Sequence, residues 1–196
     1  MKYFIAILAT YPFLGQNVAL ARDFNLSDDY EIIGEFTTMI DGDAGDYYEP
    51  FPHLFIAYND KNSGTSTAVF RSDQGAKTLI LSGRQNTHDG MPEFPILSLA
   101  FRQTSNTETF VLASISYNEY RKSPCIWIAK DGIGNLDPLN LKIGNVFENN
   151  KITFEFTATL SPQTTYPNPE PATLFTCSHV KNITGIFIGE IPATPQ

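Results

Sequence analysis

The chain has 196 residues, a formal net charge of −8 at pH 7 and aromatic side chains at 13% of its positions. This length suits one domain with a substantial core. The acidic balance opposes binding to nucleic-acid phosphates and to anionic lipid, so neither is an expected partner.

Residues 1–21 have the order of a secretory signal peptide. Lys2 precedes an apolar run of about a dozen residues, and Ala19-Leu20-Ala21 provides the small-x-small pattern of a cleavage site. A membrane anchor would need roughly 20 apolar residues, whereas proline and glycine interrupt this run. We therefore expect a secreted or periplasmic mature chain, residues 22–196, that does not insert into a membrane. Loss of Lys2 moves its formal charge from −8 to −9.

The mature chain reads as a series of strands. In "KITFEFTATL", residues 151–160, apolar and polar side chains alternate, as a half-buried strand requires. Other β-rich runs, separated by turn sequences, are 30–40, 53–59, 66–72, 77–82, 94–102, 108–117, 124–130, 141–146, 172–177 and 184–191. No amphipathic helix of any length is evident.

About ten short strands predict a single all-β domain. The first choice of architecture is an antiparallel β-sandwich of jelly-roll type, and a closed barrel is the second choice. The four prolines of "SPQTTYPNPEPA", residues 161–172, indicate an extended loop or an edge cover instead of a central strand.

The two cysteines, Cys125 and Cys177, predict one disulfide in an oxidising compartment; two buried free thiols are the alternative. Closing this loop would stabilise the fold by roughly 4 kcal/mol. The single tryptophan, Trp127, alternates in phase with Cys125 and is interpreted as a core residue.

The segment "DGDAGDYYEP", residues 41–50, is a candidate metal site. Carboxylates are the hard ligands that Ca²⁺ prefers, and glycines let a backbone wrap an ion. The EF-hand spacing does not fit, so a solvated acidic loop is the favoured interpretation and a looser calcium loop the alternative; no cofactor is required. The candidate ligands are Asp41, Asp43, Asp46 and Glu49.

The segment "GRQNTHDGMPEF", residues 83–94, is a candidate ligand-binding loop, because it is longer than a tight hairpin needs. It holds Arg84, His88, Asp89 and Glu93, which suit an anion, a sugar hydroxyl or proton transfer. An ordinary exposed loop is the alternative. Tyr47 and Tyr48 add clustered rings that could stack on sugar faces.

Recognisable catalytic motifs are missing: the sequence contains no H-E-x-x-H, P-loop or G-x-S-x-G pattern. We therefore expect a binding protein, with carbohydrate or another cell-surface ligand as the first hypothesis. An extracellular protein-binding factor, such as an inhibitor, immunity protein or secreted effector, is the alternative. A hydrolase that acts on polysaccharide through two carboxylates is a third hypothesis.

Overall fold

The structure is a computed structural model, and it describes residues 27–41, 52–73, 76–86, 92–104, 109–119, 125–130, 135–136, 140–142, 151–164 and 179–190. This part of the chain is built from strands and contains no helix, which confirms the all-β prediction. The strands are β1 (Tyr30–Asp41), β2 (Pro52–Asp60), β3 (Thr65–Ser66), β4 (Ala68–Asp73), β5 (Ala76–Asn86), β6 (Pro92–Gln103), β7 (Thr109–Asn118), β8 (Cys125–Lys130), β9 (Asn135–Leu136), β10 (Asn140–Lys142), β11 (Lys151–Thr164) and β12 (Lys181–Glu190).

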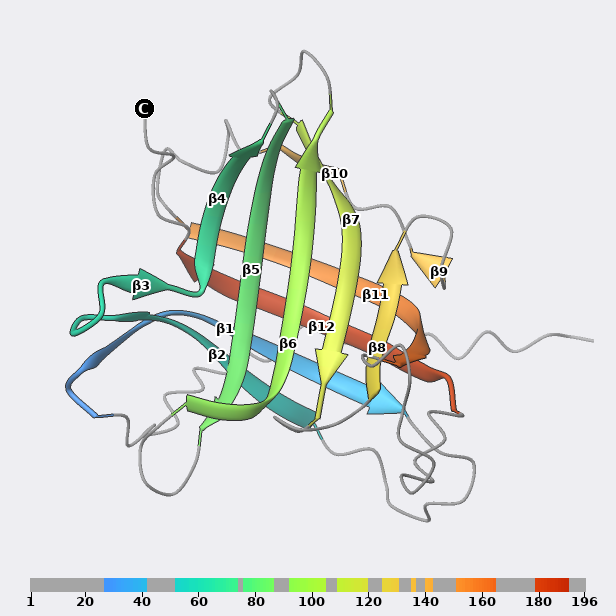
Figure 1. Ribbon diagram of the computed structural model, residues 1–196, viewed down its shortest axis with the longest axis horizontal. Helices are drawn as coiled ribbons and strands as arrows, with labels where there is room; N and C mark the ends of the chain where they lie inside the picture. Colours follow the sequence, from blue (N-terminus) through green and yellow to red (C-terminus); the bar gives the residue numbers. More distant parts are fainter. Residues whose placement is uncertain are drawn as a thin grey trace, which may run out of the picture.

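All the strands belong to one antiparallel sheet, in the order β3-β2-β1-β12-β11-β8-β7-β6-β5-β4, with β10 beside β7 and β9 beside β11. Most neighbours are consecutive in the chain, and β12 returns to pair with β1. Strands β4 to β8 form a front layer, and β1, β2, β11 and β12 run crosswise behind it (Figure 1). The sheet therefore curls into a barrel-like ring, and the predicted sandwich of jelly-roll type is not confirmed.

The ring is not evenly closed, because its two layers join along short seams. Strands β8 and β11 pair over only four residues, whereas β11 and β12, both in the back layer, pair over ten. Between β2 and β5 a single pair, Ile56 with Arg84, closes the ring. Thr67 strengthens this seam: its N–H donates to the carbonyl of Tyr58 at 2.9 Å, and its own carbonyl accepts from the N–H of Ser82 at 2.8 Å.

The interior of the ring is filled by phenylalanine side chains from both layers. Phe187 packs against Phe36 and Phe154, with ring centroids 4.6 and 5.3 Å apart, and Phe154 reaches Phe101 at 5.5 Å. All four rings are buried. Because burial of one such side chain contributes about 1.5–3 kcal/mol, this stack is a main source of stability.

One close approach in the back layer requires glycine. Gly34 of β1 lies directly opposite Gly189 of β12, and the ring of Phe187 covers the pair. A Cβ on Gly34 would stand 2.5 Å from Cζ of Phe187. The two glycines therefore make room for the aromatic ring that fills the centre of the core.

The prediction for residues 161–172 is wrong at its first four positions. Strand β11 continues through Pro162 to Thr164, and these residues pair with β8. The β11–β12 ladder ends at Leu160, so Pro162 has a strand partner on one side within the described residues. A proline without an N–H donor is tolerated in a strand that is paired on one side. The predicted strand 172–177 lies outside the described residues.

Candidate functional site

Four pairs of strands meet at one end of the ring, and we call this end the polar end. The register places Asp41 opposite Asn182, Asn86 opposite Pro92, Tyr117 opposite Trp127 and Thr164 opposite Cys125. The chain segments 42–51 and 87–91 therefore begin and end here. The predicted loop 83–94 is wrong at residues 83–86 and 92–94, which belong to strands β5 and β6. The strand ends that flank 42–51 and 87–91 lie at the same end of the fold.

The inward-facing rows of side chains become polar at this end. Farther into the ring these rows carry Phe, Leu, Ile and Gly, whereas here they carry Thr38, His53, Gln85, Glu119 and Lys181. Among the described residues, Thr38 and Lys181 are the two buried polar or charged side chains. We call these five residues, together with Trp127, the polar cluster.

Lys181 and Glu119 form an ion pair that crosses the end of the ring, with Nζ 2.7 Å from Oε1. Lys181 begins β12 in the back layer, and Glu119 follows β7 in the front layer, so the pair joins strands that are not neighbours in the sheet. The Lys181 side chain is 9% exposed and that of Glu119 is 27% exposed. A buried ammonium needs such a partner, because desolvation of an unpaired charge is costly.

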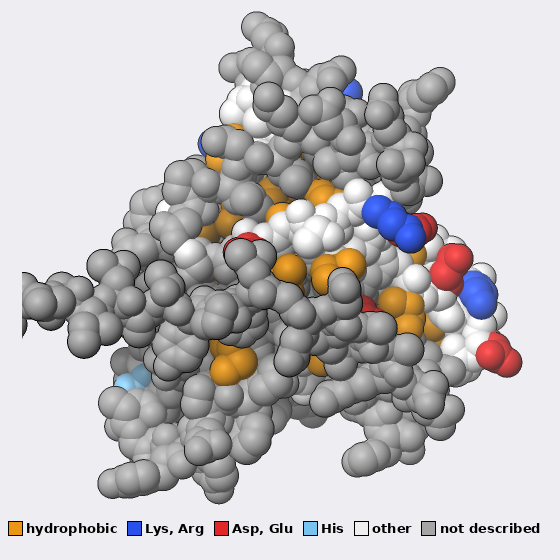
Figure 2. Space-filling view, turned by 180° about the vertical axis from the view of Figure 1, so that it is seen from behind, with side chains coloured by type: hydrophobic (Ala, Val, Ile, Leu, Met, Phe, Trp, Pro, Cys, Tyr) orange, Lys and Arg blue, Asp and Glu red, His pale blue; other side chains and the backbone are white. Residues whose placement is uncertain are grey.

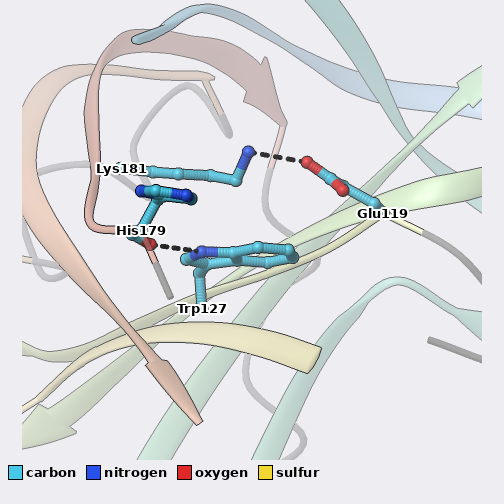
Figure 3. A network of polar contacts seen from close by, with 4 residues as sticks. All are labelled: Glu119, Trp127, His179 and Lys181. Carbon is cyan, nitrogen blue, oxygen red and sulfur yellow. Dashed lines mark hydrogen bonds and ion pairs between the residues drawn. The ribbon is translucent and has the colours of Figure 1, made fainter. Parts of the chain in front are cut away.

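The indole of Trp127 supports this ion pair from below. Nζ of Lys181 lies 4.6 Å from the ring centroid, within the range of a cation–π contact. Figure 3 shows the lysine side chain extended along the indole toward Glu119. The indole N–H donates to the backbone carbonyl of His179 at 2.9 Å, which satisfies the polar edge of a buried ring (Figure 3).

His53 of β2 and Gln85 of β5 form the second polar contact of the cluster. Nε2 of Gln85 donates to Nδ1 of His53 at 3.1 Å, so the neutral imidazole carries its proton on Nε2. Thr38 fixes the backbone here, since its hydroxyl donates to the carbonyl of His53 at 3.3 Å. Burial lowers the pKa of His53, and the charge of Lys181 lowers it further, while Glu119 opposes the shift.

The cluster is therefore balanced in charge at neutral pH. The ammonium of Lys181 is offset by the carboxylate of Glu119, and His53 is held neutral beside the uncharged amide of Gln85. Such groups can donate and accept hydrogen bonds without presenting a net charge to a ligand. Among the described residues, no group of three or more His, Cys, Asp or Glu could hold a metal ion.

Most residues predicted as site residues lie outside the described part of the chain, and their roles stay predictions. They are Asp43, Asp46, Tyr47, Tyr48, Glu49, His88 and Asp89. Asp41 and Glu93 are described only by their backbone, which pairs with Asn182 and with Gln85. Arg84 lies outside the polar cluster: Gly83 faces the core, so Arg84 points outward, where its charge acts on Tyr58.

Trp127 and Cys125 both lie in the core on the inward row of β8, as predicted for Trp127. Cys177 lies outside the described residues, so the disulfide stays a prediction. Sequence reasoning missed Lys181, although "KNITGIF" places it in phase with Ile183 at the start of an apolar row. It also missed His53, Gln85 and Glu119, which become neighbours only when the ring closes.

Comparisons of the chain with family models, with curated proteins and with solved structures find no match. Within the described ranges, no helix is long and apolar enough to cross a membrane. The polar end itself is therefore the structural feature from which we infer function.

Proposed function

We propose that the mature chain is a secreted or periplasmic binding protein whose ligand binds at the polar end, and that this ligand is a carbohydrate without net charge. The observation that carries the proposal is the charge balance of the polar cluster, in which a paired Lys181 and Glu119 stand beside the neutral His53–Gln85 contact. Hydroxyl groups both donate and accept hydrogen bonds, so a ligand rich in them can bind donors and acceptors of this kind. The signal-peptide pattern of residues 1–21 supports an extracytoplasmic site of action.

The overall charge of the chain favours a neutral ligand over an anionic one. A mature chain with a formal charge of −9 repels anions at long range, and the ammonium of Lys181 is already neutralised by Glu119. The phenylalanine stack fills the interior, so a ligand would contact the rim of the ring and not its centre.

The test is a panel of neutral and acidic oligosaccharides, screened against residues 22–196 and followed by calorimetry on the hits. Gln85→Ala removes an amide of the cluster, and we expect it to weaken binding about tenfold, the equivalent of one net hydrogen bond. Gln163→Ala is the matched control. Gln163 of β11 pairs with Ile126, whose side chain points outward, so Gln163 lies on the outer face of the sheet. A panel without any binder, or equal losses in both variants, would contradict the proposal.

An exposed apolar side chain on the outer face of the back layer favours protein binding as the second candidate function. Ile188 of β12 is 57% exposed and stands opposite Glu35 of β1. Burial raises the pKa of the Glu35 carboxyl, which reflects its partly apolar surroundings. Seen from behind, hydrophobic side chains lie at the surface among polar ones (Figure 2). Stoichiometric co-purification of a protein partner, lost in Ile188→Lys but kept in Gln85→Ala, would favour this second function.

A further inference from the structure

The seam between β2 and β5 is the weakest junction of the ring, and the polar cluster contributes to it. One residue pair, Ile56 with Arg84, joins the two strands. Thr67 reinforces the side of the seam away from the polar end. On the other side, toward the polar end, a side-chain contact joins the same two strands, with Nε2 of Gln85 3.1 Å from Nδ1 of His53. A titratable side chain thus helps to hold the least-paired junction of the fold.

The groups around His53 make its protonation unfavourable while the seam is closed. Burial lowers the pKa of His53, the ammonium of Lys181 at the start of β12 lowers it further, and the carboxylate of Glu119, which follows β7, raises it. Its neighbours from β1 and β5, Thr38 and Gln85, do not titrate. A proton on Nδ1 would require the Gln85 amide to turn its oxygen toward the ring, and it would place a second positive charge in a half-buried position near Lys181.

We propose that protonation of His53 opens the β2–β5 seam at the polar end, so that a ligand bound there is released as the pH falls below neutrality. An opened seam exposes the imidazole to water and removes it from the ammonium. Release of the ligand rests on the proposed function, whereas opening of the seam does not. Mild acidification would thus act as a signal for release in an extracytoplasmic binding protein.

The direction of the pH effect follows from the lowered pKa of His53. At pH values between that lowered pKa and the ordinary value near 6.5, the closed state binds fewer protons than the open or unfolded state. The stability contributed by the neutral imidazole is therefore fully present above about pH 6.5. It is lost as the pH falls toward the pKa of the closed state. Each unit of difference in pKa changes the ratio of closed to open states by about tenfold.

The test is amide hydrogen exchange of ligand-free residues 22–196 at pH 7.5 and 5.5, with rates corrected for the intrinsic effect of pH. We expect protection at Ile56 and Arg84 to fall by up to about tenfold at the lower pH, which is one unit below the ordinary pKa of histidine, while the β11–β12 ladder keeps its protection. His53→Asn supplies an amide oxygen near the position of Nδ1 and cannot take up a proton, so it should abolish the response. His179→Asn is the matched control, because His179 contributes its backbone carbonyl to the cluster.

The proposal would be overturned by equal protection at both pH values, by a uniform loss over all strands, or by a response that persists in His53→Asn. Should that variant fold poorly, the wild-type imidazoles can be titrated by NMR, since the chain has only three histidines. The resonance of His53 must then follow the midpoint of the exchange transition. Because no ligand is present, these outcomes do not depend on whether a carbohydrate binds. Affinity at both pH values then tests release separately.

Discussion

Replacement of Glu119 by glutamine tests the ion pair that crosses the polar end. The substitution keeps the size of the side chain and one acceptor oxygen, and it removes the charge. It leaves the ammonium of Lys181 9% exposed beside Trp127 without its partner at 2.7 Å. We therefore expect Glu119→Gln to destabilise the fold.

The magnitude follows from the burial of the two partners. Removing one partner of a fully buried pair costs about 3–5 kcal/mol, and an exposed pair contributes about 0.2–1 kcal/mol. Glu119 is 27% exposed, so the pair lies between these limits, and we expect a loss of about 2 kcal/mol. For a domain of this size the melting temperature should fall by roughly 4–8 °C. Urea unfolding of residues 22–196 measures the free energy directly.

Two further variants distinguish the ion pair from a general effect of lost charge. Glu155→Gln changes an exposed carboxylate on β11 and should alter stability by less than about 0.5 kcal/mol. Combining Glu119→Leu with Lys181→Met removes both charges and should recover most of the loss, because no unpaired charge remains. If Glu119→Gln unfolds at the same urea concentration as Glu155→Gln, the reasoning is refuted.

Three other predictions concern the core, the cysteines and the acidic segment. Gly185→Ala would place a Cβ 2.6 Å from Cζ of Phe156 and should cost about 1–3 kcal/mol in urea unfolding; wild-type stability would contradict the packing. Denatured but unreduced protein should show no reactive thiol if Cys125 and Cys177 are bonded, and two thiols would disprove the disulfide. The melting temperature measured in millimolar Ca²⁺ should equal that measured in EDTA. An increase of several degrees, lost when Asp41, Asp43 and Asp46 become Asn, would instead establish a metal site.

The strands were predictable from the sequence, because the alternation of apolar and polar residues is a property of one short segment. The alternation in residues 151–160 places Phe154 and Phe156 in the core, where the structure has them, and β11 begins at the predicted Lys151. Side-chain alternation depends only on the geometry of an extended chain. The alternation is therefore the same whichever strand this segment pairs with.

The closure of the sheet was not predictable from the same signal. The alternation of side chains does not indicate that β12 pairs with β1, or that β2 pairs with β5 through Ile56 and Arg84. A sandwich and a curled ring bury one face of each strand in the same way.

The polar cluster escaped prediction for the same reason. His53, Gln85 and Lys181 are far apart in the sequence, and each resembles an ordinary polar residue at the end of a strand. Only the register brings their inward rows to one end of the ring. The sequence predicts Arg84 in a loop, whereas the structure places it in β5 with its side chain pointing outward; its part in ligand binding stays a prediction.

The most direct test of the account is an NMR titration of ¹⁵N-labelled residues 22–196 with the oligosaccharide panel. Trp127 is the single tryptophan, so its indole N–H gives one unambiguous reporter within the polar cluster. We expect a neutral oligosaccharide to shift this resonance together with the amide resonances of Thr38, His53 and Gln85. Shifts confined to the outward face around Ile188, or no shift with any member of the panel, would contradict a carbohydrate site at the polar end.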